Sequence, residues 1–210
     1  KFQTFKTDLF QSQFDNKRFK RLKSFELSEK SFIKLGKYAK SLGLLFISTP
    51  LDIKSSDFLE DIVDFYKIAS GDNNFFPLIK NVILKKKPVI ISTGFLNLTS
   101  INELKKKIIK IIGKKNFFKN IAFLHCVSSY PTLSSKANLR SILRIKKITG
   151  TTIGYSDHTI GIDAVLVALS LGAKIIEKHF TLSKTYSNFR DHALSADKEE
   201  LAYIVSGVRK

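Results

Sequence analysis

Short apolar runs alternate along the chain with longer segments in which apolar residues recur at helical spacing. The short runs are rich in isoleucine, valine and phenylalanine, a composition typical of β-strands. They lie at 1–5, 44–49, 64–70, 88–93, 121–128, 151–157 and 173–180. Alternation of such strands with amphipathic helices indicates βα units around a parallel sheet.

The clearest helical pattern covers residues 101–112, where apolar positions fall on one face. Ser100 with Glu103 predicts a capping box at its start, and Gly113 predicts its end. Further helices are expected at 29–42, at 162–171 and at about 196–208. Segment 162–171 is apolar nearly all round, so we expect a well-buried helix.

Seven units in 210 residues average about 30 residues each, close to one eighth of a (β/α)8 barrel of roughly 250 residues. An open doubly wound sheet would usually carry a glycine-rich phosphate turn after its first strand, and no such turn occurs here. We therefore predict an α/β fold, a (β/α)8 TIM barrel truncated at its N-terminus to about seven units. Residues 1–210 would form one catalytic domain. Because the chain lacks methionine and opens on a strand, we expect a fragment.

The net charge of +18 raises the possibility of nucleic-acid binding. The lysines are spread over most predicted helices rather than gathered in one stripe, which favours a compositional bias and no nucleic-acid partner. Apolar residues make up 43% and charged residues 26%, a globular composition. No run is long enough to span a membrane, and the single Cys126 fits a reducing compartment. We expect a cytoplasmic protein without a membrane partner.

Polar residues gather at the C-terminal ends of the predicted strands, the active face of a (β/α) barrel. In chain order they are Lys67, Ser70, Asp72, Ser92, Thr93, His125, Ser128, Tyr130, Ser156, Asp157, His158, Glu177, Lys178 and His179, followed by Asp191 and His192 in the last loop. Packing alone does not account for so many polar residues on one rim.

Two histidines follow adjacent strands. Alternation along a strand places Ser156 with His158 on one face, and Glu177 with His179 on one face of the next strand. A single strand-end histidine is more often structural, but a neighbouring pair with carboxylates beside it favours a metal site. Two imidazoles with oxygen ligands suit a borderline ion such as Mn²⁺ or Zn²⁺.

Hydroxyl groups and backbone amides at Ser70, Ser92, Thr93 and Gly94 predict a phosphate-binding cradle, although such residues also end strands and cap helices. Lys67 lies inside an apolar strand, where an unpaired lysine is costly. It could bind an anion or form a Schiff base.

Several motifs together resemble the sialic acid synthase family, the N-acetylneuraminate, pseudaminate and legionaminate synthases. The motifs are KFQTF, YKIASGD, KPVIISTG, LHCVSSYPT, GYSDHT, IEKHFT and DHALS. They cover nearly the whole chain. The most specific feature is GYSDHT followed by EKHFT about 20 residues later.

The resemblance implies condensation of phosphoenolpyruvate with an N-acetylated aminosugar to a nine-carbon 2-keto acid, with phosphate release. It implies His158 and His179 as ligands of a divalent metal, Mn²⁺ first and Mg²⁺ or Co²⁺ next. The implied substrate-binding residues are Lys1, Lys67, Ser70, Ser92, Ser128, Tyr130 and Ser156. Asp72 and Asp191, with Lys67, would be catalytic. Asp72 stands where many members carry Glu, and Ser128 where some carry Asn, and both replacements shorten or change the reach of the polar group.

Two family features are missing from these 210 residues. They are a leading βα unit with an Asn-His-Asn-Gly-type turn, and a C-terminal antifreeze-like domain that contributes to the partner's site in a homodimer. We therefore expect little activity from the chain alone and a homodimer for the complete protein. The alternatives are a Schiff-base aldolase using Lys67 or Lys178, a basic nucleic-acid-binding domain and an inactive barrel.

Overall fold

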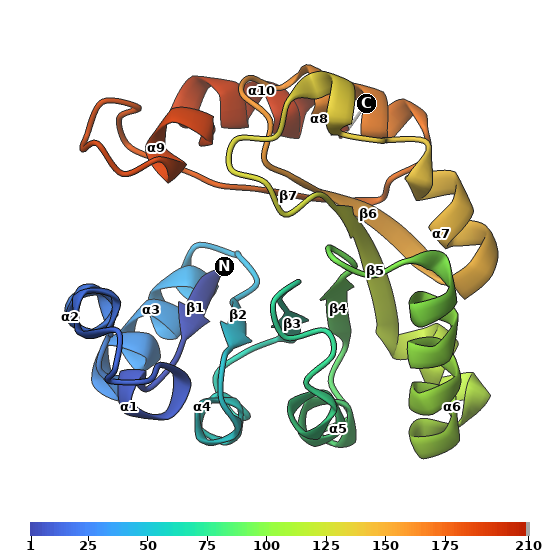
Figure 1. The fold of residues 1–210 in the computed structure, drawn as a ribbon, viewed down its shortest axis with the longest axis horizontal. Helices are drawn as coiled ribbons and strands as arrows, with labels where there is room; N and C mark the ends of the chain where they lie inside the picture. The colour runs from blue at the N-terminus through green and yellow to red at the C-terminus, as the bar shows by residue number, and fades with distance from the viewer. Residues whose placement is uncertain (209–210) are drawn as a thin grey trace. The chain divides into compact units, whose positions relative to one another are not determined.

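The computed structural model describes residues 1–208 and divides the chain into two compact units (Figure 1). The first comprises Lys1–Ile91 and Ile108–Asn120, and the second comprises Ser92–Lys107 and Ile121–Lys210. In both, parallel strands follow one another in chain order and helices connect them, so the predicted class of successive βα units is confirmed.

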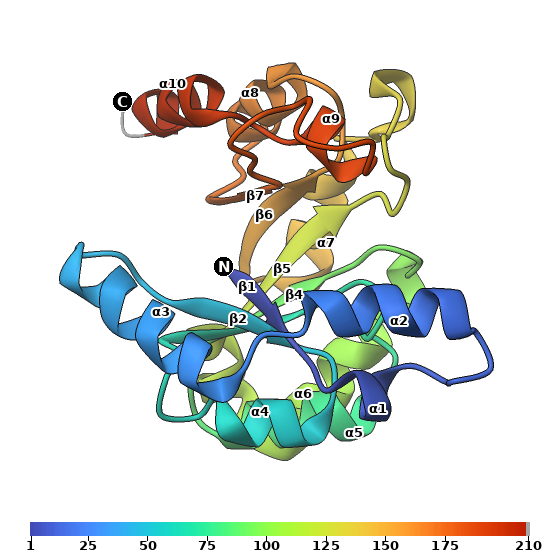
Figure 2. The same cartoon turned by 90° about the vertical axis from the view of Figure 1, so that its left-hand side faces the viewer.

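The first unit is built on parallel strands β1 (Phe2–Thr4), β2 (Ile47–Pro50), β3 (Phe65–Ile68) and β4 (Val89–Ser92), of which only the last residue, Ser92, belongs to the second unit. Its helices are α1 (Thr7–Phe10), α2 (Asn16–Phe25), α3 (Glu29–Ser41), α4 (Ile53–Phe58) and α5 (Phe76–Leu84). Figure 2 shows α1 and α2 beside β1. Helices α4 and α5 pack against each other (Figure 1). Tyr66, Ile68, Leu78 and Ile79 are fully buried in its core.

The second unit is built on parallel strands β5 (Ile121–Cys126), β6 (Thr152–Asp157) and β7 (Ile175–Lys178). Its other elements are a 3₁₀ turn at Ser134–Lys136 and helices α7 (Ser141–Thr149), α8 (Asp163–Ser170), α9 (Asp191–Leu194) and α10 (Lys198–Val208). Every residue of β5 is buried, as expected for a strand covered on both faces. Val165, Ala196 and Ile204 join α8 and α10 in a shared apolar cluster.

Helix α6 (Leu98–Asn120) corrects one local prediction. Asn97, not Ser100, caps its start, because the Asn97 side chain accepts a hydrogen bond from the Ser100 amide at 2.8 Å. The predicted end at Gly113 is confirmed as a break, since Gly113 has a φ of 78° inside the segment. The expectation of a well-buried helix at 162–171 holds for Ala164, Val165 and Ala168 of α8, but Val167 is 49% exposed.

Gly154 sets how closely β6 and β7 approach. A Cβ at this position would lie 2.3 Å from the Ile175 carbonyl oxygen and 2.5 Å from Leu124 Cδ2. Only glycine fits such a close backbone approach. The strand pair that ends in the two candidate metal ligands therefore depends on this residue.

Among the described residues, no helix has the length and apolar character that crossing a membrane would require.

Candidate metal and phosphate sites

The second unit brings the two predicted metal ligands together. His158 follows the last residue of β6 and His179 follows the last residue of β7. Their ring centroids lie 5.5 Å apart with an interplanar angle of 60°. His158 is buried and the His179 side chain is 35% exposed. Two nearby imidazoles, one of them open to solvent, can share an incoming ion.

Hydrogen bonding fixes which nitrogen of His158 can bind a metal. Its Nδ1 lies 2.9 Å from the Val127 carbonyl oxygen, an acceptor, so Nδ1 carries the proton. Nε2 then presents its lone pair. The Nδ1 atom of His179 faces Asp191 Oδ2 at 3.8 Å. A carbonyl or carboxylate behind a ligating histidine is the usual way proteins orient the ring.

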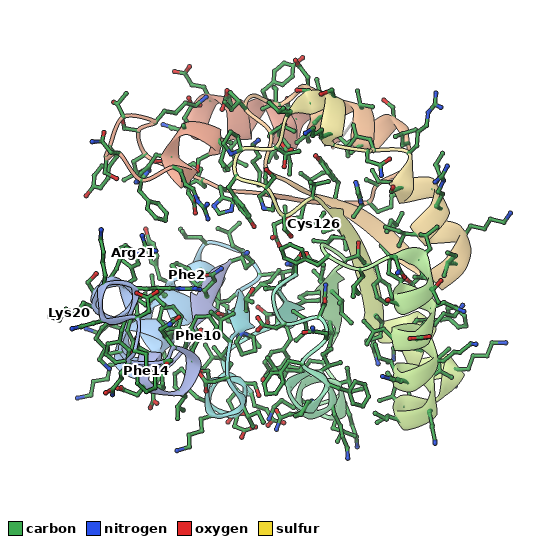
Figure 3. All side chains as sticks on the ribbon, in the orientation of Figure 1. Phe2, Phe10, Phe14, Lys20, Arg21 and Cys126 are labelled. Carbon is green, nitrogen blue, oxygen red and sulfur yellow. The ribbon has the colours of Figure 1, made fainter. Side chains whose placement is uncertain are left out.

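Cys126 is a neighbour of this pair that the sequence did not single out. Its sulfur lies 3.9 Å from His158 Nδ1, and Figure 3 shows it on β5. Burial lowers the pKa of His158, but Cys126, the Val127 carbonyl and the negative charge of Glu177 outweigh burial and raise the pKa. The thiol, the carbonyl and the carboxylate around the ring thus stabilise positive charge at His158.

Aromatic and cationic side chains surround the pair. The Tyr130 ring centroid lies 4.1 Å from that of His158 and 6.0 Å from that of His179. Arg190 Cζ lies 5.0 Å from the Tyr130 centroid. Burial raises the pKa of Tyr130 to about 12, so its phenol remains a neutral hydrogen-bond donor. Tyr130 can thus pack against His158 and still bind a polar ligand.

Two carboxylates lie close by, as predicted. Ser156 donates a hydrogen bond to Glu177 at 3.2 Å, so these two residues lie on the same side of the β6–β7 strand pair. Asp191 lies between His179 and Arg190, with Oδ1 3.5 Å from Arg190 Nε. Within residues 1–208, no cluster of three or more His, Cys, Asp or Glu side chains is suited to a metal ion. The described chain therefore offers two nitrogen ligands, and substrate or water would have to complete the coordination.

Not every polar strand-end residue joins this cluster. His125 Nε2 hydrogen-bonds to the Ala137 carbonyl at 2.8 Å, and burial lowers the pKa of His125, so this histidine is a neutral structural residue. Ser128 is different. Its buried hydroxyl makes no hydrogen bond with the described residues, and it lines a cavity of about 530 Å³ with Thr93 and Arg144. Ser92 is also buried in this unit.

The first unit holds the other predicted residues. Lys67 is 3% exposed on β3, and Ser70 and Asp72 follow in the loop after this strand. Burial raises the pKa of Asp72 to about 6, although the charge of Lys67 acts in the opposite direction. A buried lysine and a carboxyl group that titrates near neutrality are suited to anion binding and proton transfer. Lys1 is exposed at the start of the chain, and its role remains a prediction.

Thr49 was missed by the sequence analysis. It lies near the end of β2, and its Oγ1 is buried without a hydrogen-bond partner among the described residues. The available signal was a hydroxyl residue near the end of an apolar run, the same feature that identified Ser92 and Thr93.

Lys178 must be removed from the Schiff-base candidates. Its side chain is 3% exposed and its Nζ lies 2.6 Å from Asp157 Oδ2 and 2.6 Å from the Thr159 carbonyl oxygen. A side-chain amine that is buried and bonded to two acceptors in this way is not placed to attack a carbonyl.

Comparison with known proteins identifies the family to which this chain belongs. The model of the NeuB family matches residues 1–210, and the chain belongs to that family. An uncharacterized protein of Methanocaldococcus jannaschii is 45% identical over 210 residues, which cover all of this chain and 60% of that protein. The N,N'-diacetyllegionaminic acid synthase of Campylobacter jejuni is 36% identical over 93% of this chain and 58% of that enzyme.

A solved structure extends the match to the fold. The crystal structure of N-acetylneuraminic acid synthetase from Leptospira borgpetersenii superimposes with a TM-score of 0.88 at 33% identity, covering 99% of this chain and 70% of that one. The resemblance to sialic acid synthases predicted from the motifs is thus confirmed. The chain spans about 60% of the length of the two curated relatives.

Proposed function

We propose that this chain carries the metal-binding and phosphoenolpyruvate-binding residues of a synthase that condenses phosphoenolpyruvate with an N-acetylated aminosugar. The observation that carries the proposal is the His158–His179 pair, whose rings lie 5.5 Å apart with Nε2 of His158 available to a cation. Two of these relatives are named as a legionaminic acid synthase and an N-acetylneuraminic acid synthetase, which supports this class of reaction.

In the proposed reaction, C3 of phosphoenolpyruvate forms a bond to the aldehyde carbon of the sugar. Water adds at C2, and phosphate leaves by cleavage of its C–O bond, which gives a 2-keto acid. A divalent ion at the two histidines, Mn²⁺ in the first place and Mg²⁺ or Co²⁺ otherwise, would act as a Lewis acid toward the aldehyde oxygen.

The residues of the chain would bind the substrates and handle protons. The buried ammonium of Lys67 would neutralise phosphate or carboxylate, which a buried cation does strongly. Asp72, whose pKa is about 6, would exchange a proton with the attacking water. Asp191 would accept a hydrogen bond from the sugar. Hydrogen bonds to phosphoenolpyruvate would come from Lys1, Ser70, Ser92, Ser128, Tyr130 and Ser156.

The test is an assay of the protein expressed from its full gene. Phosphate release and 2-keto acid formation are measured with phosphoenolpyruvate and N-acetylmannosamine, a 2,4-diacetamido sugar or a phosphorylated aminosugar. We expect both products in equal amounts, loss of activity with EDTA and recovery with Mn²⁺. Turnover that persists without metal, or borohydride trapping of pyruvate on Lys67, would contradict the proposal.

Size-exclusion chromatography with light scattering tests the proposed homodimer, and cell fractionation tests the cytoplasmic location.

A further inference from the structure

A fully buried ion pair lies directly beside the two candidate metal ligands. Asp157 Oδ2 and Lys178 Nζ are 2.6 Å apart, and the two side chains are 0% and 3% exposed. Asp157 immediately precedes His158 and Lys178 immediately precedes His179. They face each other as the last paired residues of the β6–β7 ladder.

The pair lies on the opposite strand face from the histidines. Ser156 and Glu177 are hydrogen-bonded on the ligand-bearing face, and side chains alternate along a strand. Asp157 and Lys178 therefore project to the other side. The pair cannot take part in metal binding directly, so any influence must pass through the backbone that holds His158 and His179.

The hydrogen bonds of the pair hold the backbone on both sides of His158. Asp157 Oδ1 accepts from the Thr159 amide and the Thr159 hydroxyl at 2.9 Å each, and from the Tyr155 hydroxyl at 3.0 Å. Lys178 Nζ donates to the Thr159 carbonyl oxygen at 2.6 Å. Thr159, which follows His158, is thus hydrogen-bonded both to Asp157, which precedes His158, and to Lys178, which precedes His179.

These bonds matter because the ladder itself ends at this point. Beyond Asp157 and Lys178, no further β6–β7 pairing fixes the positions of residues 158 and 179 in the described chain. The Thr132 amide holds the His158 carbonyl at 2.8 Å, and the Ala196 amide holds the His179 carbonyl at 2.8 Å. Those contacts anchor each histidine to a different segment. In the described part of the chain, Asp157 and Lys178 form the ion pair that joins the two strand ends to each other.

A buried ion pair is a weak source of net stability, because desolvation offsets most of the attraction between the charges. We propose that Asp157 and Lys178 are positioning residues that set the separation and orientation of His158 and His179 for a divalent ion. This inference rests on the proposed metal-dependent function and deepens it. Neither residue touches the ion or the substrates.

The test compares Co²⁺ binding with folding. In the Asp157→Asn/Lys178→Met double variant both charges are removed, but the introduced amide keeps an acceptor for Thr159 and Tyr155. Co²⁺ affinity and the visible Co²⁺ absorption spectrum are measured by titration, and folding by circular dichroism and thermal unfolding. We expect a folded protein with a changed spectrum and Co²⁺ affinity about 10- to 100-fold weaker, the range for residues that orient ligands. Wild-type affinity and spectrum in the folded double variant would overturn the inference.

The matched control is Lys85→Met, which removes another largely buried lysine with two acidic partners, Asp57 and Glu60. Its Co²⁺ affinity should equal that of the wild type. If the double variant does not fold, Lys178→Arg keeps the charge but places a larger group in a site that is 3% exposed. We expect that variant to bind Co²⁺ at least about 10-fold more weakly, and unchanged binding would overturn the inference. Absence of Co²⁺ binding by the wild type would instead contradict the proposed function, and the inference with it.

Discussion

His158 and His179 face each other with ring centroids 5.5 Å apart, although 20 residues separate them in the chain. Parallel pairing of β6 with β7 brings them together, because each follows the last residue of its strand. The Asp191 carboxylate lies on the Nδ1 side of the His179 ring, and the Val127 carbonyl lies on the Nδ1 side of the His158 ring. This geometry underlies the proposal that the two rings share one cation.

Removal of either histidine should abolish this shared binding. We expect His158→Ala or His179→Ala to weaken Mn²⁺ binding by more than about 100-fold, since a remaining single imidazole is a poor site. Isothermal titration calorimetry measures the affinity. His192→Ala is the control, because His192 hydrogen-bonds to Thr181 at 2.8 Å. Equal losses in all three variants would argue against the assignment.

The Tyr130 ring should support His158 by packing. Tyr130→Ala removes a ring 4.1 Å from the His158 ring and should weaken Mn²⁺ binding about 10-fold. Tyr130→Phe keeps the ring and should bind Mn²⁺ within about twofold of the wild type. Similar affinities for the two variants would show that packing of the ring does not matter.

Close approach of β6 and β7 should depend on Gly154. A Cβ there meets the Ile175 carbonyl oxygen at 2.3 Å, so we expect Gly154→Ala to lower the free energy of unfolding by about 2–4 kcal/mol. Urea denaturation measures the change. The control is Gly71→Ala, where a Cβ meets nothing within 4 Å and the change should stay within about 0.5 kcal/mol. Equal stability of the two variants would contradict the close approach of the strands.

Lys67 should bind phosphoenolpyruvate through its charge. Lys67→Met should weaken phosphoenolpyruvate binding about 10- to 100-fold, the value of a lost charged hydrogen bond. Lys80→Met, on the exposed side of α5, should leave the affinity unchanged. Binding measured by fluorescence or calorimetry distinguishes the two, and an equal effect would point to net charge rather than to Lys67.

Asp72 should make stability depend on pH. Because its pKa is raised to about 6 in the folded state from 3.8, the unfolded chain ionises first, and stability falls as pH rises from about 4 to 6. Asp72→Asn removes this loss. The free energy of unfolding of the variant minus that of the wild type should be about 1–2 kcal/mol larger at pH 7 than at pH 4. This is less than the about 3 kcal/mol that the full pKa shift would give, because the carboxyl is partly exposed.

Urea denaturation at the two pH values gives this difference, with the exposed Asp61→Asn variant as the control for altered net charge. The change caused by Asp61→Asn is subtracted from the change in the free energy of unfolding caused by Asp72→Asn. If the remaining gain is no larger at pH 7 than at pH 4, the result contradicts the raised pKa of Asp72.

Much of this arrangement followed from local sequence rules. Strand periodicity predicted that Ser156 shares a face with His158 and Glu177 with His179, and the Ser156–Glu177 hydrogen bond shows that these two faces lie on the same side of the sheet. The sequence could not show that Lys178 is buried against Asp157, because that depends on the register between two strands. Similarly, the cap of α6 is Asn97 and not Ser100, three positions earlier than predicted. Hydrophobic periodicity does not locate the first residue of a helix that closely.

Long-range packing also explains why local sequence patterns did not identify two residues. Cys126 carries no local signal of function, whereas Thr49 carried only the weak signal of a hydroxyl residue near the end of an apolar run. Cys126 lies near His158, 32 residues away in sequence. The Thr49 hydroxyl is buried with no hydrogen-bond partner among the described residues. His125, by contrast, shared the strand-end pattern of the metal ligands but hydrogen-bonds to a backbone carbonyl.

The most direct test is a crystal structure of the Mn²⁺-soaked protein, with anomalous diffraction collected at the manganese absorption edge. We predict one strong anomalous peak within about 2.0–2.3 Å of Nε2 of both His158 and His179, a bond length typical of first-row metals and imidazole. A peak that contacts only one of these histidines, or a fully loaded crystal with manganese bound elsewhere, would contradict the shared metal site.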